Sequence, residues 1–274
     1  MCGIFGVVCF NGGTIDEGLL TKMGRLLTHR GPDAQKIKVY KKEDLTCYLG
    51  ANRLKILDLS DNANMPMANE DGSIAAVFNG EIYNYQTLKQ EQKNRGHLFK
   101  TRTDSEVIPH AYEDSGEACF SLFEGMFAAA IWDGLNGRLV LGRDRTGKKP
   151  LFYYYDGKHF AFASEIKALL ILPFVRKKIN ENKLAEYFSL GYTNGPGTFY
   201  EGIFELMPAS FLAIDAEEVN PAEKYWELEY SREDFKPSYT FEDAGLKTKE
   251  IIERAVAKRL ASDVPLGVLL SGGH

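Results

Sequence analysis

The chain opens with the apolar stretch MCGIFGVVCF (residues 1–10), in which residues 4–8 predict a buried strand. No basic residue precedes Lys22, and the spacing of Gly3 and Gly6 is more typical of a strand than of a signal peptide. No run in the sequence approaches the ~20 apolar residues of a membrane-spanning helix. We therefore expect a cytoplasmic protein without a membrane partner, whose first strand follows a cysteine at position 2.

The composition is that of an ordinary folded protein of one or two domains. The 274 residues are 44% hydrophobic and carry a formal net charge of −5. This balance gives no reason to expect disorder or a nucleic-acid partner, and nothing in it indicates an oligomeric state. The four cysteines form no C-x-x-C pair and the five histidines form no H-E-x-x-H motif. We therefore expect neither a metal site nor a disulfide framework.

Short runs rich in β-branched and aromatic residues follow the first strand and predict further strands. These runs cover residues 36–40, 45–51, 54–57, 74–78, 126–132, 138–142, 151–155 and 160–163. Helices are expected over residues 15–28 and 180–190. A third helix is predicted to begin at Thr103 and Glu106, which have the spacing of a capping box, and to end at Gly116.

The pattern changes toward the C-terminal end. Residues 217–238 are acidic and irregular, which is typical of a domain edge. An amphipathic helix over residues 241–260 and a strand over residues 264–270 then open a second, α/β unit. We therefore divide the chain into a first domain of residues 1–215 and a linker with the truncated start of a second domain over residues 216–274.

Cys2 is the first candidate for chemistry. Aminopeptidases remove an initiator methionine when the next residue is small, and here that would leave one residue with a thiol and a free α-amine. The thiol is a nucleophile, and an amine with a pKa of about 7.7–8.0 can accept and return a proton near neutral pH. Enzymes with an N-terminal threonine use the same logic. The alternative is a structural cysteine that is buried at the start of a strand.

Asn79 and Gly80 follow an apolar run at residues 75–78. One interpretation is a hairpin turn, which Asn-Gly strongly favours. The other is an oxyanion hole, in which the Asn79 amide and the Gly80 N–H converge on the oxygen of a tetrahedral acyl intermediate. Both interpretations stay open on these residues alone.

Arg53, Glu81 and Asp104 form a third group, and each stands next to a predicted strand end or helix start. A free amino acid as substrate needs a bidentate partner for its α-carboxylate, which arginine supplies, and carboxylates for its α-ammonium. Alternatively each residue is a surface charge or, for Asp104, an acid that the helix dipole favours in a first turn.

Together these motifs resemble the glutamine-hydrolysing asparagine synthetases. The similar stretches are collinear and cover nearly the whole chain. They are MCGIFGV (1–7), RGPD (30–33), RLKILDL (53–59), FNGEIYNY (78–85), TDSEVI (103–108), EGMFAAAIWD (124–133), GRDRTGKKPLFY (142–153), ASEIKAL (163–169) and SDVPLGVLLSGG (262–273).

The resemblance implies an α+β fold, a four-layer αββα sandwich of the N-terminal-nucleophile (Ntn) hydrolase type. Such a domain hydrolyses L-glutamine to glutamate and ammonia without a cofactor. By this resemblance Cys2 is the nucleophile, Asn79 and Gly80 form the oxyanion hole, Arg53 holds the glutamine carboxylate, and Glu81 and Asp104 face its amino group. The other residues implied in glutamine binding are Leu54, Lys55, Ile56 and Leu57.

In the full-length family, ammonia travels to a synthetase domain in which ATP and Mg²⁺ activate aspartate. Leu269, Ser271, Gly272 and Gly273 match residues near ATP, but the sequence stops within that loop. We therefore expect only the glutaminase half-reaction from this chain, with the missing synthetase domain as its partner. Two alternatives remain: the glutaminase half of an amidotransferase that acts on a sugar or a peptide, and a non-catalytic fragment.

Overall fold

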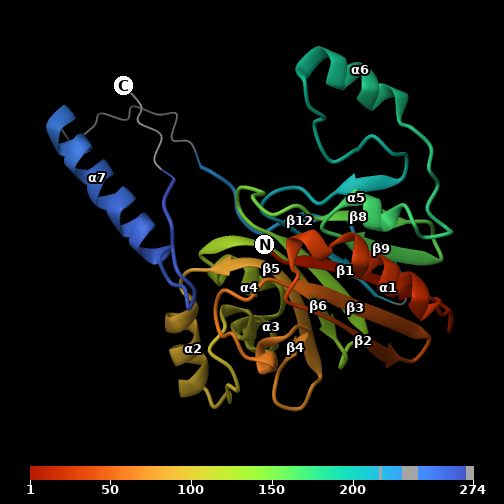
Figure 1. Ribbon diagram of the computed structural model, residues 1–274, viewed down its shortest axis with the longest axis horizontal. Helices are drawn as coiled ribbons and strands as arrows, with labels where there is room; N and C mark the ends of the chain where they lie inside the picture. Colours follow the sequence, from red (N-terminus) through yellow and green to blue (C-terminus); the bar gives the residue numbers. More distant parts are fainter. Residues whose placement is uncertain (216–217, 230–239, 270–274) are drawn as a thin grey trace.

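The structure is a computed structural model that describes residues 1–215, 218–229 and 240–269. Two six-stranded antiparallel sheets form its centre, with strand orders β10-β8-β9-β1-β3-β2 and β12-β11-β7-β6-β5-β4 (Figure 1). The strands are β1 (Gly3–Cys9), β2 (Ala34–Lys42), β3 (Leu45–Arg53), β4 (Met67–Ala68), β5 (Ile74–Ile82), β6 (Gly125–Asp133), β7 (Arg138–Arg143), β8 (Phe152–Tyr155), β9 (His159–Ala163), β10 (Ile203–Glu205), β11 (Ser210–Ile214) and β12 (Glu223–Lys224). The α-helices are α1 (Glu17–Leu26), α2 (Tyr85–Asn94), α3 (Val107–Ser115), α4 (Cys119–Leu122), α5 (Ile166–Leu169), α6 (Glu181–Leu190) and α7 (Phe241–Lys258).

The sheets and helices stack in four layers. One apolar core fills the space between the two sheets and continues under α3 and α4. A second core lies between the β1 sheet and the helices α1 and α5. The order helix, sheet, sheet, helix confirms the α+β sandwich that the sequence predicted.

β1 is the central strand of its sheet and is buried along its whole length. It lies between β3 and β9. Gly6 makes this close packing possible, because a Cβ there would lie 2.4 Å from the Phe162 ring and 2.5 Å from the Tyr48 carbonyl oxygen. The N-terminal motif therefore places Cys2 at the end of a rigid, fully buried strand.

β5 extends four residues beyond the predicted strand end and includes Asn79 and Gly80. Asn79 lies opposite Ala128 of β6, and Gly80 lies opposite Phe127. A Cβ at position 80 would lie 2.1 Å from the Met126 carbonyl oxygen, so only glycine fits there. The hairpin-turn interpretation of Asn-Gly is therefore wrong, because sheet pairing continues through both residues.

Two local predictions fail beside this strand. Residues 54–57 form a loop instead of a strand, and Asp58, at φ +55°, turns the chain away from the sheet. Thr103 does cap the helical turn that follows, by accepting from Ser105 N–H. Glu106 does not complete a capping box, because its carboxylate binds the N–H groups of Lys100 (2.7 Å) and Thr101 (2.8 Å).

The other predicted helices are confirmed to within two residues. α1 occupies the middle of the predicted range 15–28, α6 begins after Asn180, and α3 ends at Gly116, whose φ of +55° suits glycine. The strands predicted over residues 36–40, 45–51, 74–78, 126–132, 138–142, 151–155 and 160–163 correspond to β2, β3 and β5 to β9. The sequence analysis did not predict α2, α4, α5, β4, β10, β11 or β12.

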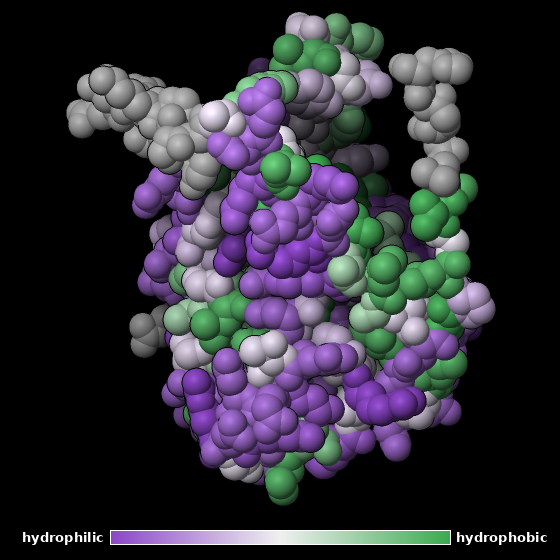
Figure 2. Space-filling view, turned by 90° about the vertical axis from the view of Figure 1, so that its left-hand side faces the viewer, coloured by the Kyte–Doolittle hydropathy of each residue, from purple (hydrophilic) through white to green (hydrophobic). Residues whose placement is uncertain are grey.

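The C-terminal segment lies apart from both cores. α7 confirms the helix predicted over residues 241–260, but its apolar side chains are exposed, Phe241 by 91% and Leu246 by 70% (Figures 1 and 2). Residues 264–269 form no strand, because no described strand lies alongside to pair with them; residue 270 lies outside the described residues. No helix in the described ranges combines the length and apolar character that crossing a membrane requires.

Candidate active site

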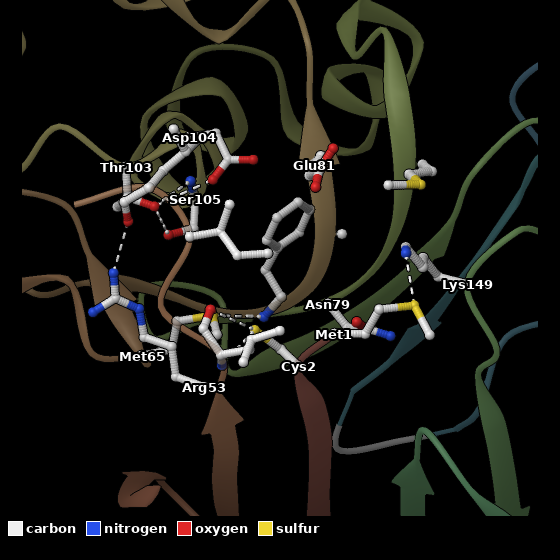
Figure 3. Close-up of a pocket in the computed structure, with 16 residues that line it drawn as sticks. Met1, Cys2, Arg53, Met65, Asn79, Glu81, Thr103, Asp104, Ser105 and Lys149 are labelled. Carbon is white, nitrogen blue, oxygen red and sulfur yellow. Dashed lines mark hydrogen bonds between the residues drawn. The ribbon is translucent and has the colours of Figure 1, made fainter. Parts of the chain in front are cut away.

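A cavity of about 90 Å³ gathers most of the residues that the sequence predicted to act together (Figure 3). It lies where the start of β1, the far half of β5 and the loop after β3 meet. Its lining residues are Met1, Cys2, Arg53, Leu54, Ile56, Leu57, Met65, Phe78, Asn79, Gly80, Glu81, Thr103, Asp104, Ser105, Met126 and Lys149. Lys55 is the exception, since it does not line the cavity and its Nζ pairs with Asp61 at 2.8 Å.

The Cys2 thiol faces the loop after β3. Its Sγ accepts a hydrogen bond from Leu54 N–H at 3.5 Å and lies 4.0 Å from the Leu54 carbonyl oxygen. Burial raises the pKa of the Cys2 thiol, and the Leu54 hydrogen bond and the N-terminal charge offset this only in part. Burial lowers the pKa of the Met1 amine in the same cavity. The Met1 amine is therefore more readily neutral than an exposed N-terminal amine.

The backbone of Cys2 is anchored by residues that sequence reasoning left without a role. Arg30 Nε donates to the Cys2 carbonyl oxygen at 3.0 Å, and Arg30 Nη1 pairs with Glu165 at 2.9 Å. Burial alone would raise the pKa of Glu165, but hydrogen bonds from Lys167, Arg30 and His29 hold it at about 2. Glu165 therefore stays ionised at neutral pH and keeps Arg30 in place. Both residues lie in stretches that the sequence analysis singled out: Arg30 in RGPD (30–33) and Glu165 in ASEIKAL (163–169).

Asn79 is the most unusual residue of the cavity. Its side chain is fully buried, and neither Nδ2 nor Oδ1 has a hydrogen-bond partner among the described residues. A buried amide without a partner costs about 1–3 kcal/mol, and native structures hold few such groups. The Asn79 amide is therefore free to bind a polar atom that enters the cavity.

The pairing of β5 with β6 sets the direction of the Gly80 N–H. Phe127 lies opposite Gly80, and its N–H donates to Asp144 Oδ2 at 3.1 Å while its carbonyl oxygen accepts from Asp144 N–H at 2.8 Å. The polar backbone groups of Phe127 therefore point away from β5. In an antiparallel pair the residue opposite then also points away from its partner strand. Gly80 N–H accordingly faces the open side of β5.

That open side of β5 is the cavity wall. The N–H two residues before Gly80, on Phe78, donates to Met65 Sδ at 3.2 Å, and the N–H two residues after it, on Ile82, donates to Asp104 Oδ2 at 2.9 Å. The N–H groups of Phe78 and Ile82 therefore point to the same side of the strand as the Gly80 N–H, toward Met65 and Asp104. The Asn79 amide and the Gly80 N–H thus form a pair of adjacent donors near Cys2.

The Arg53 guanidinium organises the loop that follows β3. Nη1 donates to the Ser60 carbonyl oxygen at 2.8 Å and to Asn64 Oδ1 at 3.1 Å. Nη2 donates to the carbonyl oxygens of Leu57, at 2.9 Å, and of Asp58. These bonds use all four terminal N–H groups, so among the residues that the structure describes Nε alone is left without a partner. Arg53 therefore shapes the cavity wall at Leu57 and reaches the cavity itself.

The carboxyl groups of Asp104 and Glu81 and the ammonium of Lys149 also line the cavity (Figure 3). Burial raises the pKa of Asp104 to about 6, although hydrogen bonds from Ile82 and Thr103 oppose the shift. Burial also raises the pKa of Glu81 and lowers that of Lys149. Lys149 Nζ lies 3.0 Å from Met1 Sδ. Lys149 belongs to the stretch GRDRTGKKPLFY (142–153), but sequence reasoning gave it no role in the Cys2 cavity.

The residues predicted near ATP are not part of this cavity. Leu269 is fully exposed, and Ser271, Gly272 and Gly273 lie outside the described residues. The described chain therefore provides no surroundings for a nucleotide at Leu269.

Comparisons with known proteins show which family the chain is similar to. Residues 1–226 match the glutamine amidotransferase domain family, and residues 247–274 match the asparagine synthase family. The chain is 38% identical over 290 residues to a putative glutamine-hydrolysing asparagine synthetase 2 of Methanocaldococcus jannaschii and 35% identical over 277 residues to asparagine synthetase 3 of Bacillus subtilis. All of this chain aligns in both cases, but it covers 55% and 44% of those proteins, so it spans about half of their length.

Solved structures show the same fold at lower sequence identity. The glutamine phosphoribosylpyrophosphate amidotransferase of B. subtilis, solved with ADP and GMP, superposes with a TM-score of 0.58 at 19% identity, over 82% of this chain and 49% of that one. The fold, the order of the motifs and the sequence similarity over the whole of this chain all indicate the same family. The chain therefore belongs to the glutamine amidotransferase domain family, in the form found in glutamine-hydrolysing asparagine synthetases, and continues into the beginning of an asparagine synthase domain.

Proposed function

We propose that the chain hydrolyses L-glutamine to glutamate and ammonia, with Cys2 as the nucleophile once Met1 is removed. The observation that carries this proposal is the fully buried Asn79 amide, which has no described partner and lines the same cavity as the Cys2 thiol. An amide left unsatisfied in the free protein is what a site needs in order to bind charge that develops during a reaction.

The proposed reaction has two stages. The α-amine of Cys2 takes the thiol proton, and the sulfur attacks the carboxamide carbon of glutamine to form a C–S bond. The carbonyl oxygen becomes an oxyanion that accepts hydrogen bonds from Asn79 Nδ2 and Gly80 N–H. The amine returns its proton to the leaving nitrogen, the C–N bond breaks, and ammonia departs from a glutamyl thioester. Water, which gives a proton to the same amine, then attacks the thioester carbon; the C–S bond breaks, the proton returns to the sulfur, and glutamate is released.

The direct test is release of glutamate from glutamine by the purified chain, with the intact mass of the same sample recorded. We expect turnover in samples that lack Met1. Absence of turnover from folded chain that lacks Met1 would refute the proposal for this chain. Because Met1 lines the cavity and contacts Lys149, samples that retain it are expected to be inactive.

Arg53→Lys is expected to raise the KM for glutamine about 10- to 100-fold while changing kcat much less. Lysine keeps the charge, but its three N–H groups cannot satisfy the four acceptors that Arg53 binds in the loop over residues 57–64. Hydrogen bonds of charged groups are worth about 1.5–3 kcal/mol each. Arg25→Lys, at an exposed position of α1, is the control. A KM unchanged from the parent value would remove Arg53 from glutamine binding.

Glutamine binding is expected to weaken as the pH falls through about 6. The pKa of Asp104 is about 6, so its carboxylate is present above that pH, where it attracts the glutamine ammonium, and is lost below it. KM measured from pH 5 to 8 should therefore rise at the acidic end. Asp104→Asn keeps an acceptor for Ile82 N–H and should give a high KM without this rise. The same steep rise in Asp104→Asn would assign the titration to another group.

The ammonia is proposed to serve a synthetase domain in a longer protein, which uses ATP and Mg²⁺ to convert aspartate to asparagine. The support is the match of residues 247–274 to asparagine synthases and the position of that segment. A second, smaller cavity shares Leu57, Glu81 and Asp104 with the Cys2 cavity and is also lined by Lys258, Arg259 and Ala261. The end of α7 and the residues that follow it thus lie next to the proposed glutamine site.

We place the glutaminase domain at residues 1–215 and the linker with the start of the synthetase at residues 216–274. β12, which pairs with β11, and the family match through residue 226 favour a boundary some residues later.

The cytoplasm is the proposed compartment. The free thiols of Cys2, Cys9, Cys47 and Cys119 support it.

A further inference from the structure

A group of potential metal ligands lies outside the Cys2 cavity, beside α3. It consists of Glu70, His97, His110 and Glu113, whose ligand atoms all lie within 4.8 Å of one another. Glu70 comes shortly after β4, and His97 follows α2. His110 and Glu113 are three residues apart on α3 and therefore share one helix face. None of the four lines the Cys2 cavity.

His110 is the member of this group that lacks any other explanation. Its side chain is 1% exposed, and neither Nδ1 nor Nε2 has a hydrogen-bond partner in the described part of the chain. The ring is held by Phe99, with ring centroids 4.5 Å apart, and by His97, at 4.8 Å. A buried imidazole without a protein partner indicates a bound water or ion, or a functional role.

The spacing of the ligand atoms fits a metal ion better than hydrogen bonds. His97 Nδ1 lies 3.5 Å from Glu70 Oε1 and 3.8 Å from Glu113 Oε2, and His110 Nδ1 lies 3.5 Å from Glu70 Oε2. N–H···O hydrogen bonds are usually about 2.7–3.2 Å long. Ligand atoms around a tetrahedral Zn²⁺ with bonds of about 2.1 Å are about 3.4 Å apart. Three of the ligand-atom pairs therefore have nearly the separation found around Zn²⁺, and the widest pair, up to 4.8 Å apart, would have to close by up to about 1.4 Å on binding.

Outer contacts orient the ligands as they do in metal sites. His97 Nε2 lies 3.1 Å from Asp114 Oδ1, which leaves Nδ1 directed at Glu70 and Glu113. Asn69 Nδ2 donates to Glu113 Oε2 at 3.0 Å. A histidine that binds a metal usually donates its other N–H to a carboxylate in this way. These contacts hold the ligands in place before an ion binds.

We propose that Glu70, His97, His110 and Glu113 form a binding site for one divalent transition-metal ion, with Zn²⁺ as the ion that fits best. Two imidazoles with two carboxylates suit Zn²⁺, whereas Mg²⁺ and Ca²⁺ prefer oxygen ligands throughout. Four protein ligands leave no open position, which is typical of a structural zinc site. This departs from the expectation of no metal site, which rested on the absence of ligand pairs close in sequence.

The ion would connect three segments: the turn after β4, the segment after α2, and α3. The chain from His97 to α3 also carries Asp104, which lines the Cys2 cavity. Binding would therefore fix the segment that presents Asp104, without contact between the ion and the reacting atoms. Since an ion that binds only the folded chain stabilises it by mass action, the Tm should rise with Zn²⁺ concentration.

The test uses the metal alone on the whole chain. The chain carries Cys2→Ser, so that the thiol of the other cavity cannot bind the ion. After removal of metals with a chelator, Zn²⁺ is titrated by calorimetry, and Co²⁺ is titrated by visible absorption. We expect one equivalent of either ion and the intense absorption bands of four-coordinate Co²⁺. Failure of the folded chain to bind Zn²⁺, or Co²⁺ bands of six-coordinate intensity, would overturn the proposal.

Variants locate the ion. His97→Ala and Glu113→Gln, both at partly exposed positions, should remove stoichiometric binding, and Asp114→Asn should weaken it about 10- to 100-fold. His159→Gln is the control, since that histidine pairs with Asp156 and stacks on Phe174. Unchanged binding in His97→Ala and Glu113→Gln, or loss in His159→Gln, would refute this site. Zinc binding and glutamine turnover are measured separately, so either proposal can fail alone.

Discussion

Cys2→Ser is expected to lower glutamine hydrolysis by roughly 10³-fold or more, because loss of a nucleophile removes the covalent route. A serine hydroxyl is far harder to deprotonate than a thiol. Burial already raises the pKa of the Cys2 thiol, so the site depends on the N-terminal amine even for sulfur. The change is measured as kcat from glutamate release, on samples whose mass shows that Met1 is absent.

The control for this variant is Cys9→Ala. Cys9 lies at the other end of β1 and is fully buried in the core between the β1 sheet and α1. Its replacement should lower the Tm because it leaves a small void, while kcat stays near the parent value. Turnover of Cys2→Ser within tenfold of the parent would exclude Cys2 as the nucleophile. Loss of turnover in both variants would indicate that folding, not chemistry, limits the assay.

The N-terminal motif is an example of a feature that the sequence alone predicts. An apolar run that continues through two glycines predicted a buried strand, and Gly6 indeed lies where any side chain would collide with Phe162. Cys2, Arg53, Asn79, Gly80, Glu81 and Asp104 were predicted from the chemistry of their side chains and from family motifs, and they line one cavity. Local pattern and motif order sufficed because five of these residues lie at or near the ends of β1, β3 and β5, whose positions the sheets fix, and Asp104 lies in the helical turn before α3.

Features that depend on distant partners were not predictable. Asn79-Gly80 favours a turn locally, but β6 pairs with both residues and keeps them in a strand. Residues 54–57 look like a strand, but the Arg53 guanidinium binds the carbonyl oxygens that follow and forms a loop. In the first case a long-range strand pairing overrode the local preference, and in the second an arginine side chain four to seven residues away did so.

The histidine and glutamate group beside α3 shows the same limit. Its ligands come from three segments, and only the pair His110 and Glu113 has a recognisable spacing in the sequence. Lys149 likewise reaches the cavity from the loop after β7, far from Cys2 along the chain. Side chains that meet through tertiary packing leave no periodic signal, so only the folded structure brings them together.

Asn79→Ala is expected to lower kcat about 10²- to 10³-fold, which corresponds to about 2.7–4 kcal/mol of transition-state stabilisation, with a smaller effect on KM. The reason is that the oxyanion forms only after the sulfur attacks, so its hydrogen bond from Asn79 Nδ2 is made in the transition state and not in the bound substrate. The Gly80 N–H stays in place and should preserve the residual activity. Steady-state kinetics of glutamate release measure both constants.

Stability separates this role from a structural one. The Asn79 amide has no described partner, so its removal breaks no hydrogen bond of the free protein. The Tm of Asn79→Ala should therefore stay within a few degrees of the parent. Gln92→Met is the matched control: Gln92 is also buried, but its Nε2 donates to the Val107 carbonyl oxygen at 3.0 Å. That variant should lose about 0.5–1.5 kcal/mol of stability and keep its kcat. An unchanged kcat in Asn79→Ala would exclude the oxyanion role, and a large fall in its Tm would make Asn79 a structural residue, since an amide that only awaits an oxyanion contributes nothing to the folding of the empty site.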